Sequence, residues 1–325
     1  MTSNAGAVAT TKKVAKRHGF FADLFIRMIR EKPLGTFGLV VTVLLFFTGI
    51  FADFLAPYGG NEIHLIDRLQ PPSGTYLLGT DQLGRDILSR IIYGARVSMI
   101  IGIAATTLHT LISIVIGVSS GFIGGKYDLF MQRFVDINMS LPQLLILMTI
   151  MSIIGNGLFQ LIMVLGITGG IRGSRVIRSA VIGVKENIYV QAADAIGCKP
   201  VRSMLRHILP NVMAPIIISF TIGIGGVIMM EASLSFLGFG VPPGVPSWGS
   251  MLSGEGRQFM EAAPQLALWP GFVLSMVIYG LNMFGDGLRD LLDPRLRGGV
   301  GRYQLTEKKL AQLKQKYAGS PDQNK

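Results

Sequence analysis

Long charge-free runs of hydrophobic residues, separated by polar stretches, dominate the pattern of this sequence. An α-helix needs about 20 apolar residues to cross the hydrocarbon core of a bilayer. We therefore expect an all-α integral membrane protein with an N-terminal segment 1–33, a membrane domain 34–298 and a tail 299–325. The runs predict six transmembrane spans, at residues 35–54, 97–122, 137–154, 157–172, 212–237 and 263–285.

The apolar stretch from residue 137 to residue 171 carries no charge and is too long for one span. A helix rises about 1.5 Å per residue, and the hydrocarbon core is only about 30 Å thick. Glycine and asparagine tolerate the positive φ of a tight turn. The Gly155-Asn156-Gly157 sequence therefore predicts a hairpin between the third and fourth spans.

The second predicted span has two features of its own. Gly117 and Gly121 are spaced so that a neighbouring helix can approach closely. His109 is the ionisable residue of this span. We expect it to be packed or hydrogen-bonded inside the bundle. A proton-relay or ligand role is the alternative, because ionisable groups within a membrane are costly and often functional.

Composition and charge agree with a membrane protein. Half of the 325 residues are hydrophobic and only 15% are charged, against about a quarter in soluble domains. The net charge of +11 does not indicate nucleic-acid binding, because the basic residues lack interleaved aromatic residues. Instead, 25 of the 30 Lys and Arg residues fall on one side of the predicted topology. The positive-inside rule then places both termini and residues 173–211 in the cytoplasm.

Residues 189–211, which read YVQAADAIGCKPVRSMLRHILPN, form a polar and basic island between two apolar regions. Alanine, leucine and methionine favour helix on both sides of a break at Gly197–Pro200, where glycine relaxes the backbone and proline removes a donor. This pattern predicts two short helices joined by a bend. Such a protrusion from the membrane is suited to pressing into a groove on another protein and transmitting motion.

The same island resembles the EAA loop of ABC importer permeases. The alanine pair, the glycine and the Leu-Pro of that loop match Ala192-Ala193, Gly197 and Leu209-Pro210. The RHILPN run at 206–211 resembles the oligopeptide/dipeptide/nickel subfamily. Gln191 replaces the usual glutamate, so a contact with an arginine of the ATPase would be weakened by the lost charge. The resemblance implies that the ATPase contacts are Tyr189, Gln191, Ala192, Ala193, Asp194, Gly197, Arg202, Arg206, His207, Leu209 and Pro210.

A second group of candidates precedes the second span, in GTDQLGRDILSR, which is also similar to a run in this subfamily. Apolar residues recur at helical spacing over 87–95 and predict an amphipathic helix on the outer membrane surface. The charges either form surface pairs that hold a loop or act near the substrate entrance. These candidates are Asp81, Arg85, Asp86 and Arg90.

Two candidates come from the C-terminal half. Glu231 falls near the outer end of the fifth span, where we expect it to pair with Arg85 or Arg90, with substrate contact as the alternative. Trp248 lies in the proline-containing outer loop 238–264. It is expected to sit in an interfacial aromatic belt, or alternatively to meet a partner. The GDGLRDLLDPRLRG run that follows the sixth span resembles the family's C-terminal ending.

The sequence has no GxxxxGK[ST] motif, so we do not expect this chain to bind nucleotide or to be an enzyme. The four histidines lack ligand spacing and the only cysteine is Cys198, so neither a metal site nor an intrachain disulfide is expected. No cofactor is predicted in this chain. ATP and magnesium are expected in partner subunits.

The resemblance covers roughly residues 20–298 and implies the C-type permease subunit of a type I ABC importer, with six spans and a cytoplasmic coupling helix. It implies import of di- or oligopeptides across a bacterial or archaeal cell membrane. The implied partners are a second related permease, two ABC ATPase subunits or domains and an extracytoplasmic substrate-binding protein.

The substrate stays open at this point, because nickel, glutathione and other small-solute importers share these motifs. An ion-coupled secondary transporter and a membrane scaffold are alternatives from other classes. A secondary transporter would show paired interrupted helices with charged residues at the membrane midplane. The predicted spans are nearly charge-free apart from His109.

Overall fold

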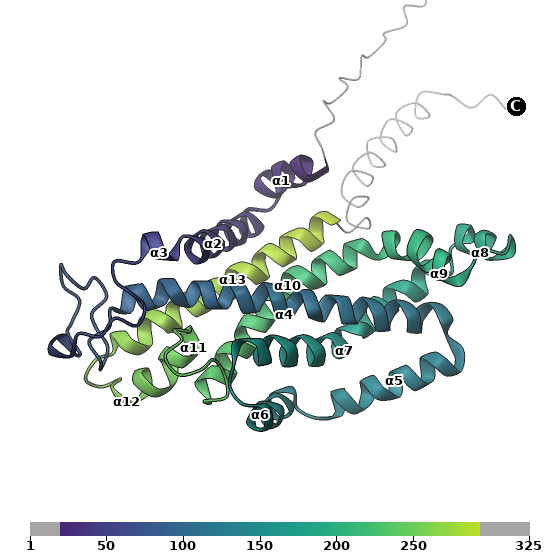
Figure 1. Cartoon of the computed structure of the whole chain (residues 1–325). Helices are drawn as coiled ribbons and strands as arrows, with labels where there is room; N and C mark the ends of the chain where they lie inside the picture. The colour runs from purple at the N-terminus through teal and green to yellow at the C-terminus, as the bar shows by residue number, and fades with distance from the viewer. Residues whose placement is uncertain (1–19, 293–325) are drawn as a thin grey trace, which may run out of the picture.

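The computed structural model describes residues 20–292, which form a mostly helical chain (Figure 1). Residues 1–19 and the predicted tail 299–325 lie outside the described residues. The α-helices are α1 (Phe20–Glu31), α2 (Pro33–Ile50), α3 (Ala52–Leu55), α4 (Ile87–Ile123), α5 (Gly125–Ser140), α6 (Gln143–Ile154), α7 (Leu158–Lys185), α8 (Ile188–Ala195), α9 (Pro200–Ser203), α10 (Met213–Phe236), α11 (Trp248–Ser250), α12 (Gly256–Gln258) and α13 (Gln265–Leu292). Short 3-10 or π turns are η1 (Leu65–Asp67), η2 (Met204–Ile208), η3 (Leu209–Val212) and η4 (Met251–Glu255).

Four helical stretches within residues 20–292 are long and apolar enough to cross a membrane: α2, α4, α13 and the stretch Pro200–Phe236 that ends in α10. The bent pair α5 and α6 makes a fifth if it counts as one span. The predicted all-α membrane fold is therefore confirmed, whereas the count of six spans is not reached by length and composition. The expected fourth span, 157–172, is the first part of α7, whose later turns carry arginines.

The boundary predicted at residue 97 does not exist. α4 begins at Ile87 and continues without a break to Ile123. The expected amphipathic surface helix is therefore wrong, because its polar residues Ser89 and Arg90 are buried along with its apolar ones. The alternation that suggested a membrane surface instead reflects packing of Ile87 and Ile91 in the first turns of α4 against residues such as Leu69 and Met251.

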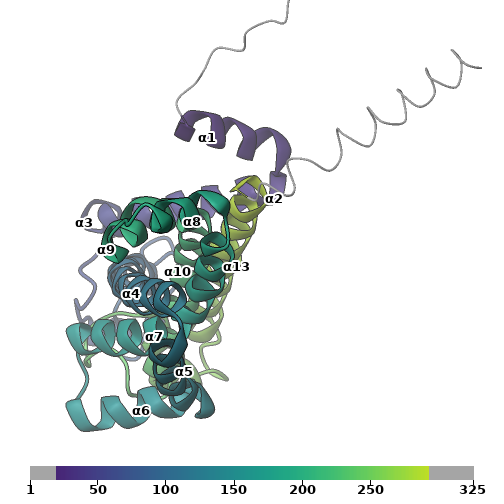
Figure 2. The same cartoon turned by 90° about the vertical axis from the view of Figure 1, so that its right-hand side faces the viewer.

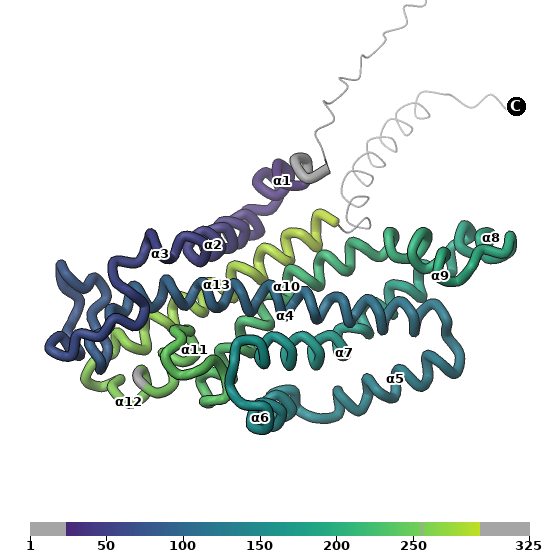
Figure 3. The backbone as a smooth tube through the Cα atoms, in the orientation of Figure 1, coloured from purple at the N-terminus to yellow at the C-terminus, as the bar shows by residue number. Residues whose placement is uncertain are grey.

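The third span also differs from the prediction. Residues 125–140, which include the charges expected in a short loop, form α5, and the chain bends by 86° between α5 and α6 (Figure 3). Proline cannot continue the hydrogen-bond ladder of the preceding helix, and Pro142 stands at the bend. Arg172 of α7 donates hydrogen bonds to the exposed carbonyls of Asn138 and Leu141. The bend is thus formed at Pro142 and stabilised by Arg172 of α7.

The hairpin predicted at Gly155-Asn156-Gly157 is confirmed. α6 ends at Ile154, Gly155 has φ of 83° and α7 begins at Leu158. α7 then runs on to Lys185 instead of ending at residue 172, so the segment assigned to the cytoplasmic loop begins as helix.

The arginines of α7 that were assigned to that loop face α5. Arg175 pairs with Asp136, and the Nε of Arg178 lies 2.6 Å from Asp128 Oδ1. Figure 2 shows the consequence from the α8–α9 end: α5 and α6 stand at one side of the bundle formed by α4, α7, α10 and α13. Polar contacts therefore hold α5 on α7.

At several glycines, the missing side chain lets two helix backbones lie in close contact. A Cβ atom on Gly117 would lie 2.7 Å from Ser174 O, and one on Gly121 would lie 3.0 Å from Arg178 O. The neighbouring helix that the sequence predicted for these glycines is therefore α7. On the other flank, a Cβ on Gly38 of α2 would lie 2.3 Å from Gly280 O of α13. Small residues let helix backbones approach within a membrane, where van der Waals packing drives association.

We predict that Gly38→Leu destabilises the protein, because the new side chain meets the backbone of α13. Overpacking typically costs about 1–3 kcal/mol. The measurement is thermal unfolding of the detergent-solubilised protein followed by tryptophan fluorescence. Gly183→Leu is the matched control, because a Cβ at Gly183 of α7 meets nothing within 4 Å. Equal unfolding temperatures of the two variants would contradict the packing.

Candidate functional site

The predicted pair of short helices is present at residues 188–212, which we call the coupling knob. α8 ends in a Schellman motif: Cys198 N–H donates to Ala193 O at 3.0 Å, and Gly197 N–H donates to Asp194 O at 3.0 Å. This motif needs a left-handed residue, and Gly197 supplies it with φ of 80°. Pro200 then occupies the first turn of α9, where proline's missing N–H costs nothing.

The coupling knob is anchored at its base. Val190, Ile208 and Val212 are fully buried and pack with residues of α4 and α7 such as Phe122 and Val181. The knob projects from one end of the bundle (Figure 1). α7 leads into it through two residues, and η3 leads directly into α10. A push on the knob would therefore reach both of these helices.

A surface hollow of about 760 Å³ lies between the two arms of the knob. Most of the predicted ATPase contacts surround it, and they come from α8, the Gly197 turn and the α9–η2 segment. Its lining is Tyr189, Ala192, Ala193, Ile196, Gly197, Cys198, Lys199, Arg202, Arg206 and His207.

The remaining predicted contacts lie around this hollow without lining it. Gln191 and Asp194 are exposed on α8, and Gln191 Nε2 donates to Glu186 O at 3.2 Å. Leu209 and Pro210 begin the turn into α10. Sequence reasoning missed Ile196, whose side chain is 86% exposed beside Gly197. The sequence signal that could have identified it is an apolar residue directly before the glycine of a polar segment.

The charges predicted for the loop before α4 meet at Asp81, and they are buried rather than superficial. Asp81 carboxylate oxygens accept from Leu83 N–H at 2.8 Å, Arg85 N–H at 3.0 Å and Arg85 Nε at 2.6 Å. Arg90 Nε lies 3.6 Å from the same carboxylate. Asp81, Arg85 and Arg90 are all at most 6% exposed. The expectation of surface pairs is wrong, since these charges lock the loop from inside.

Asp86 caps the start of α4. Its Oδ2 accepts from Ser89 N–H at 2.8 Å and from Ser89 Oγ at 2.7 Å, which satisfies a helix donor that would otherwise be unpaired. Nearby, burial raises the pKa of the Tyr76 phenol to about 12, and the Asp67 carboxylate that accepts its hydrogen bond acts in the same direction. Residues 67–89 are therefore held together by internal polar contacts.

Glu231 and Trp248 are also buried, each 1% exposed. Glu231 Oε1 accepts from Ser235 Oγ at 2.7 Å. The expected ion pair with Arg85 or Arg90 does not form, because those arginines lie at Asp81 instead. Trp248 Nε1 donates to Ile91 O at 3.1 Å. The expected interfacial position of Trp248 is wrong, since its ring fills a space between α4 and the C-terminal helices.

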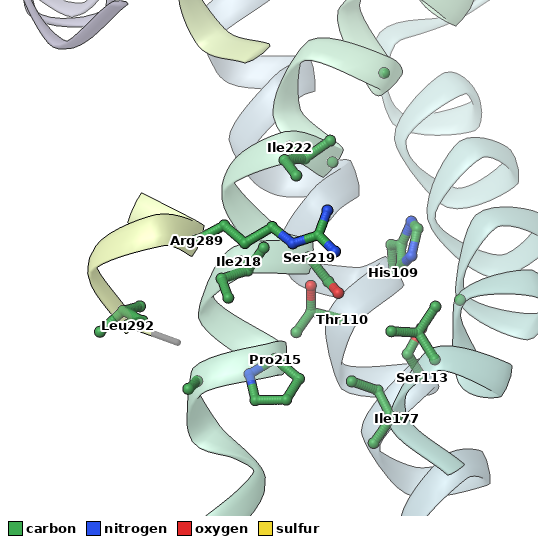
Figure 4. Close-up of a pocket in the computed structure, with 15 residues that line it drawn as sticks. His109, Thr110, Ser113, Ile177, Pro215, Ile218, Ser219, Ile222, Arg289 and Leu292 are labelled. Carbon is green, nitrogen blue, oxygen red and sulfur yellow. The ribbon is translucent and has the colours of Figure 1, made fainter. Parts of the chain in front are cut away.

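A central cavity of about 720 Å³ opens between α4, α7, α10 and the last turns of α13 (Figure 4). His109, Thr110 and Ser113 of α4 face Ser219 of α10 and Arg289 of α13 across it. A second cavity of about 360 Å³ shares His109 and extends toward Met230. Among the described residues, no cluster of three or more His, Cys, Asp or Glu side chains could hold a metal ion.

We predict that Asp81→Asn strongly destabilises the loop before α4, because it removes the buried carboxylate charge that Arg85 and Arg90 share. Breaking a buried pair costs about 3–5 kcal/mol. Asp53→Asn is the control: Asp53 pairs with Arg96 at 2.8 Å while its side chain is 62% exposed, and exposed pairs contribute little. Thermal unfolding of both variants tests this, and a larger loss for Asp53→Asn would refute the assignment.

Comparison with known proteins gives two matching families. Residues 113–298 match the binding-protein-dependent transport system inner membrane component family. Residues 21–72 match the N-terminal TM domain of oligopeptide transport permease C.

Individual relatives cover most of the chain. It is 38% identical to the oligopeptide transport system permease protein OppC of Bacillus subtilis, over 91% of this chain and 95% of that protein. It is 37% identical to the di/tripeptide transport system permease protein DppC of Pseudomonas aeruginosa, over 81% and 88% of the two chains.

A solved structure agrees in fold. A chain of the MetNI methionine ABC transporter, in an inward-facing conformation, superposes with a TM-score of 0.52 at 16% identity. The match covers 63% of this chain and 96% of that chain. With the family matches and these relatives, the chain belongs to the binding-protein-dependent transport system inner membrane components, the permease subunits of ABC importers.

Proposed function

We propose that this chain forms half of the translocation pathway of an ATP-driven importer of di- or oligopeptides and docks an ATPase through the coupling knob. The observation that carries the proposal is the knob itself: its base is buried in the bundle and its hollow is exposed. The relatives named as oligopeptide, dipeptide and di/tripeptide permeases support the substrate class.

The orientation follows from charge. Residues 1–33, 126–133, 172–211 and 286–325 together carry 25 of the 30 lysines and arginines, so the knob end faces the cytoplasm together with both termini. The outer segment around Asp81 and Trp248 then faces the extracytoplasmic side. There it meets the substrate-binding protein, and a second related permease completes the pathway.

The mechanism uses the knob as a lever. Closure of two partner ATPase subunits, which bind ATP and magnesium, displaces the knob. Because α7 and α10 both join the knob and both line the central cavity, its displacement changes the shape of that cavity. A conformational change requires contacts that differ between its two states, and the contact between knob and ATPase supplies them.

Uptake by the reconstituted complex tests this function. Vesicles containing this chain, its partner permease and the ATPases are loaded with ATP and supplied with binding protein and a labelled dipeptide. ATP-dependent accumulation of the peptide is expected. Accumulation driven by an ion gradient without ATP would indicate a secondary transporter, and no accumulation of any solute would indicate a scaffold. Nickel and glutathione uptake, measured in parallel, distinguish the other substrate classes of the family.

We predict that Gly197→Val uncouples ATP hydrolysis from uptake while the protein still inserts in the membrane. A β-branched residue at φ of 80° is strained and would distort the turn between the arms of the knob. Gly155→Val introduces the same strain at φ of 83°, in the hairpin at the opposite end of α7. The measurement is peptide molecules imported per ATP hydrolysed. A loss in Gly155→Val as large as in Gly197→Val would count against the lever.

A further inference from the structure

We propose that the central cavity contains a recognition site for the carboxylate of a substrate in transit, formed by His109 and Arg289. The identification of that carboxylate as a peptide C-terminus rests on the proposed function. The site itself rests on the positions, charges and contacts of the cavity residues. All di- and oligopeptides with free ends carry this carboxylate, so it can be recognised without reading side chains.

The His109 ring fits beside the cavity because the residues of α7 that it contacts are glycines, which have no side chain. A Cβ on Gly173 would be 2.4 Å from His109 Nε2, and one on Gly169 would be 2.7 Å from Nδ1. The ring therefore fits between α4 and α7 only against these two glycines. His109 forms no hydrogen bond with any residue in the described range 20–292. Its N–H group is available to a ligand.

Arg289 extends from the last turns of α13, and its guanidinium points across the cavity beside Ser219 (Figure 4). No hydrogen bond or ion pair joins it to another residue of the described chain. The arginines of α7 differ, since Arg172, Arg175 and Arg178 are all held by α5. Arg289 is thus an available cation directed at the cavity.

The lining contains no aspartate or glutamate that could neutralise this charge. The hydroxyls of Thr110 and Ser219 add further donors facing the same space. A guanidinium binds a carboxylate with two parallel hydrogen bonds, and a carboxylate leaving bulk water needs such compensation. Because the cavity lining has hydrogen-bond donors and a guanidinium but no carboxylate, it favours an anionic ligand over a cationic one.

His109 lies where two cavities meet. It lines the larger one, whose α10 residues run from Ala214 to Gly226, and the smaller one, whose α10 residues run from Gly223 to Met230. Arg289 lines only the larger one, nearer the coupling knob. A carboxylate moving toward the knob would therefore meet the imidazole first and the guanidinium second.

Thiol labelling of the assembled complex in nanodiscs tests the site. In a Cys198→Ser background, Ser219→Cys is reacted with an anionic and with a cationic methanethiosulfonate of similar size. The anionic reagent should react faster, and Arg289→Gln should lower the anionic-to-cationic rate ratio by roughly three- to tenfold, as expected for one nearby charge. Arg257→Gln removes an exposed arginine from the α12 end and should leave the ratio unchanged.

Ligand protection completes the test. A dipeptide at millimolar concentration should slow labelling of Ser219→Cys, whereas the same dipeptide with an amidated C-terminus should not. His109→Leu should weaken this protection. Equal protection by the amide, a ratio insensitive to Arg289→Gln, or no reaction at either Ser219→Cys or a second probe, Thr110→Cys, would overturn the proposal.

Lipid headgroups are the other anionic source. The labelling is therefore repeated in nanodiscs of purely zwitterionic lipid. Anionic-reagent preference with carboxylate-specific protection should persist there. Protection by anionic lipid but never by peptide would assign the cavity to lipid and overturn the proposal. Absence of ATP-dependent peptide uptake in the wild-type complex, with carboxylate protection intact, would instead refute the proposed function and leave the site standing.

Discussion

Close approach of α4 and α7 is the constraint on which the rest of this structure depends. The two backbones meet along glycines, with Gly117 and Gly121 on α4 and Gly166, Gly170 and Gly173 on α7. In a membrane, where lipid tails are as apolar as side chains, such packing holds helices together. The contact brings Ser113 Oγ to 2.9 Å from Gly170 O and places the central cavity beside it.

The same contact connects the two ends of the molecule. At the knob end, residues of α4 and α7 bury Val190 and Ile208, so the exposed arms stand on a rigid base. At the other end, Asp86 caps the start of α4. The backbone carbonyl of Ile91, also near this end of α4, accepts a hydrogen bond from the Trp248 indole. One helix of 37 residues thus connects the loop around Asp81 with the base of the knob.

Much of this was predictable from the sequence, and three of the failures are related. The apolar runs, the Gly155 hairpin and the bend at Gly197 were predicted correctly because each depends on local composition or on backbone freedom at one residue. The surface helix at 87–95, the exposed position of Trp248 and the Glu231 ion pair were wrong because charge and aromaticity were taken as signs of exposure. Burial of Asp81 and its arginines depends on partners distant in sequence.

The candidate site divides in the same way. The knob residues are contiguous in sequence, so a motif identified them together, and most of them surround one hollow. His109, Ser219 and Arg289 come from three helices and share no motif, so their meeting at one cavity required the fold. The arginines of α7 were taken as topological charges, whereas they hold α5 through Asp128, Asp136 and Asn138.

The bend at Pro142 has a consequence for how motion spreads. The carbonyls of Asn138 and Leu141 take their hydrogen bonds from Arg172, so the direction in which α6 leaves α5 is set by a side chain of α7. Rotation of α7 about its own axis would withdraw that guanidinium and remove the hydrogen bonds of both peptide oxygens. The direction of α6 is consequently tied to the orientation of α7 through a single guanidinium.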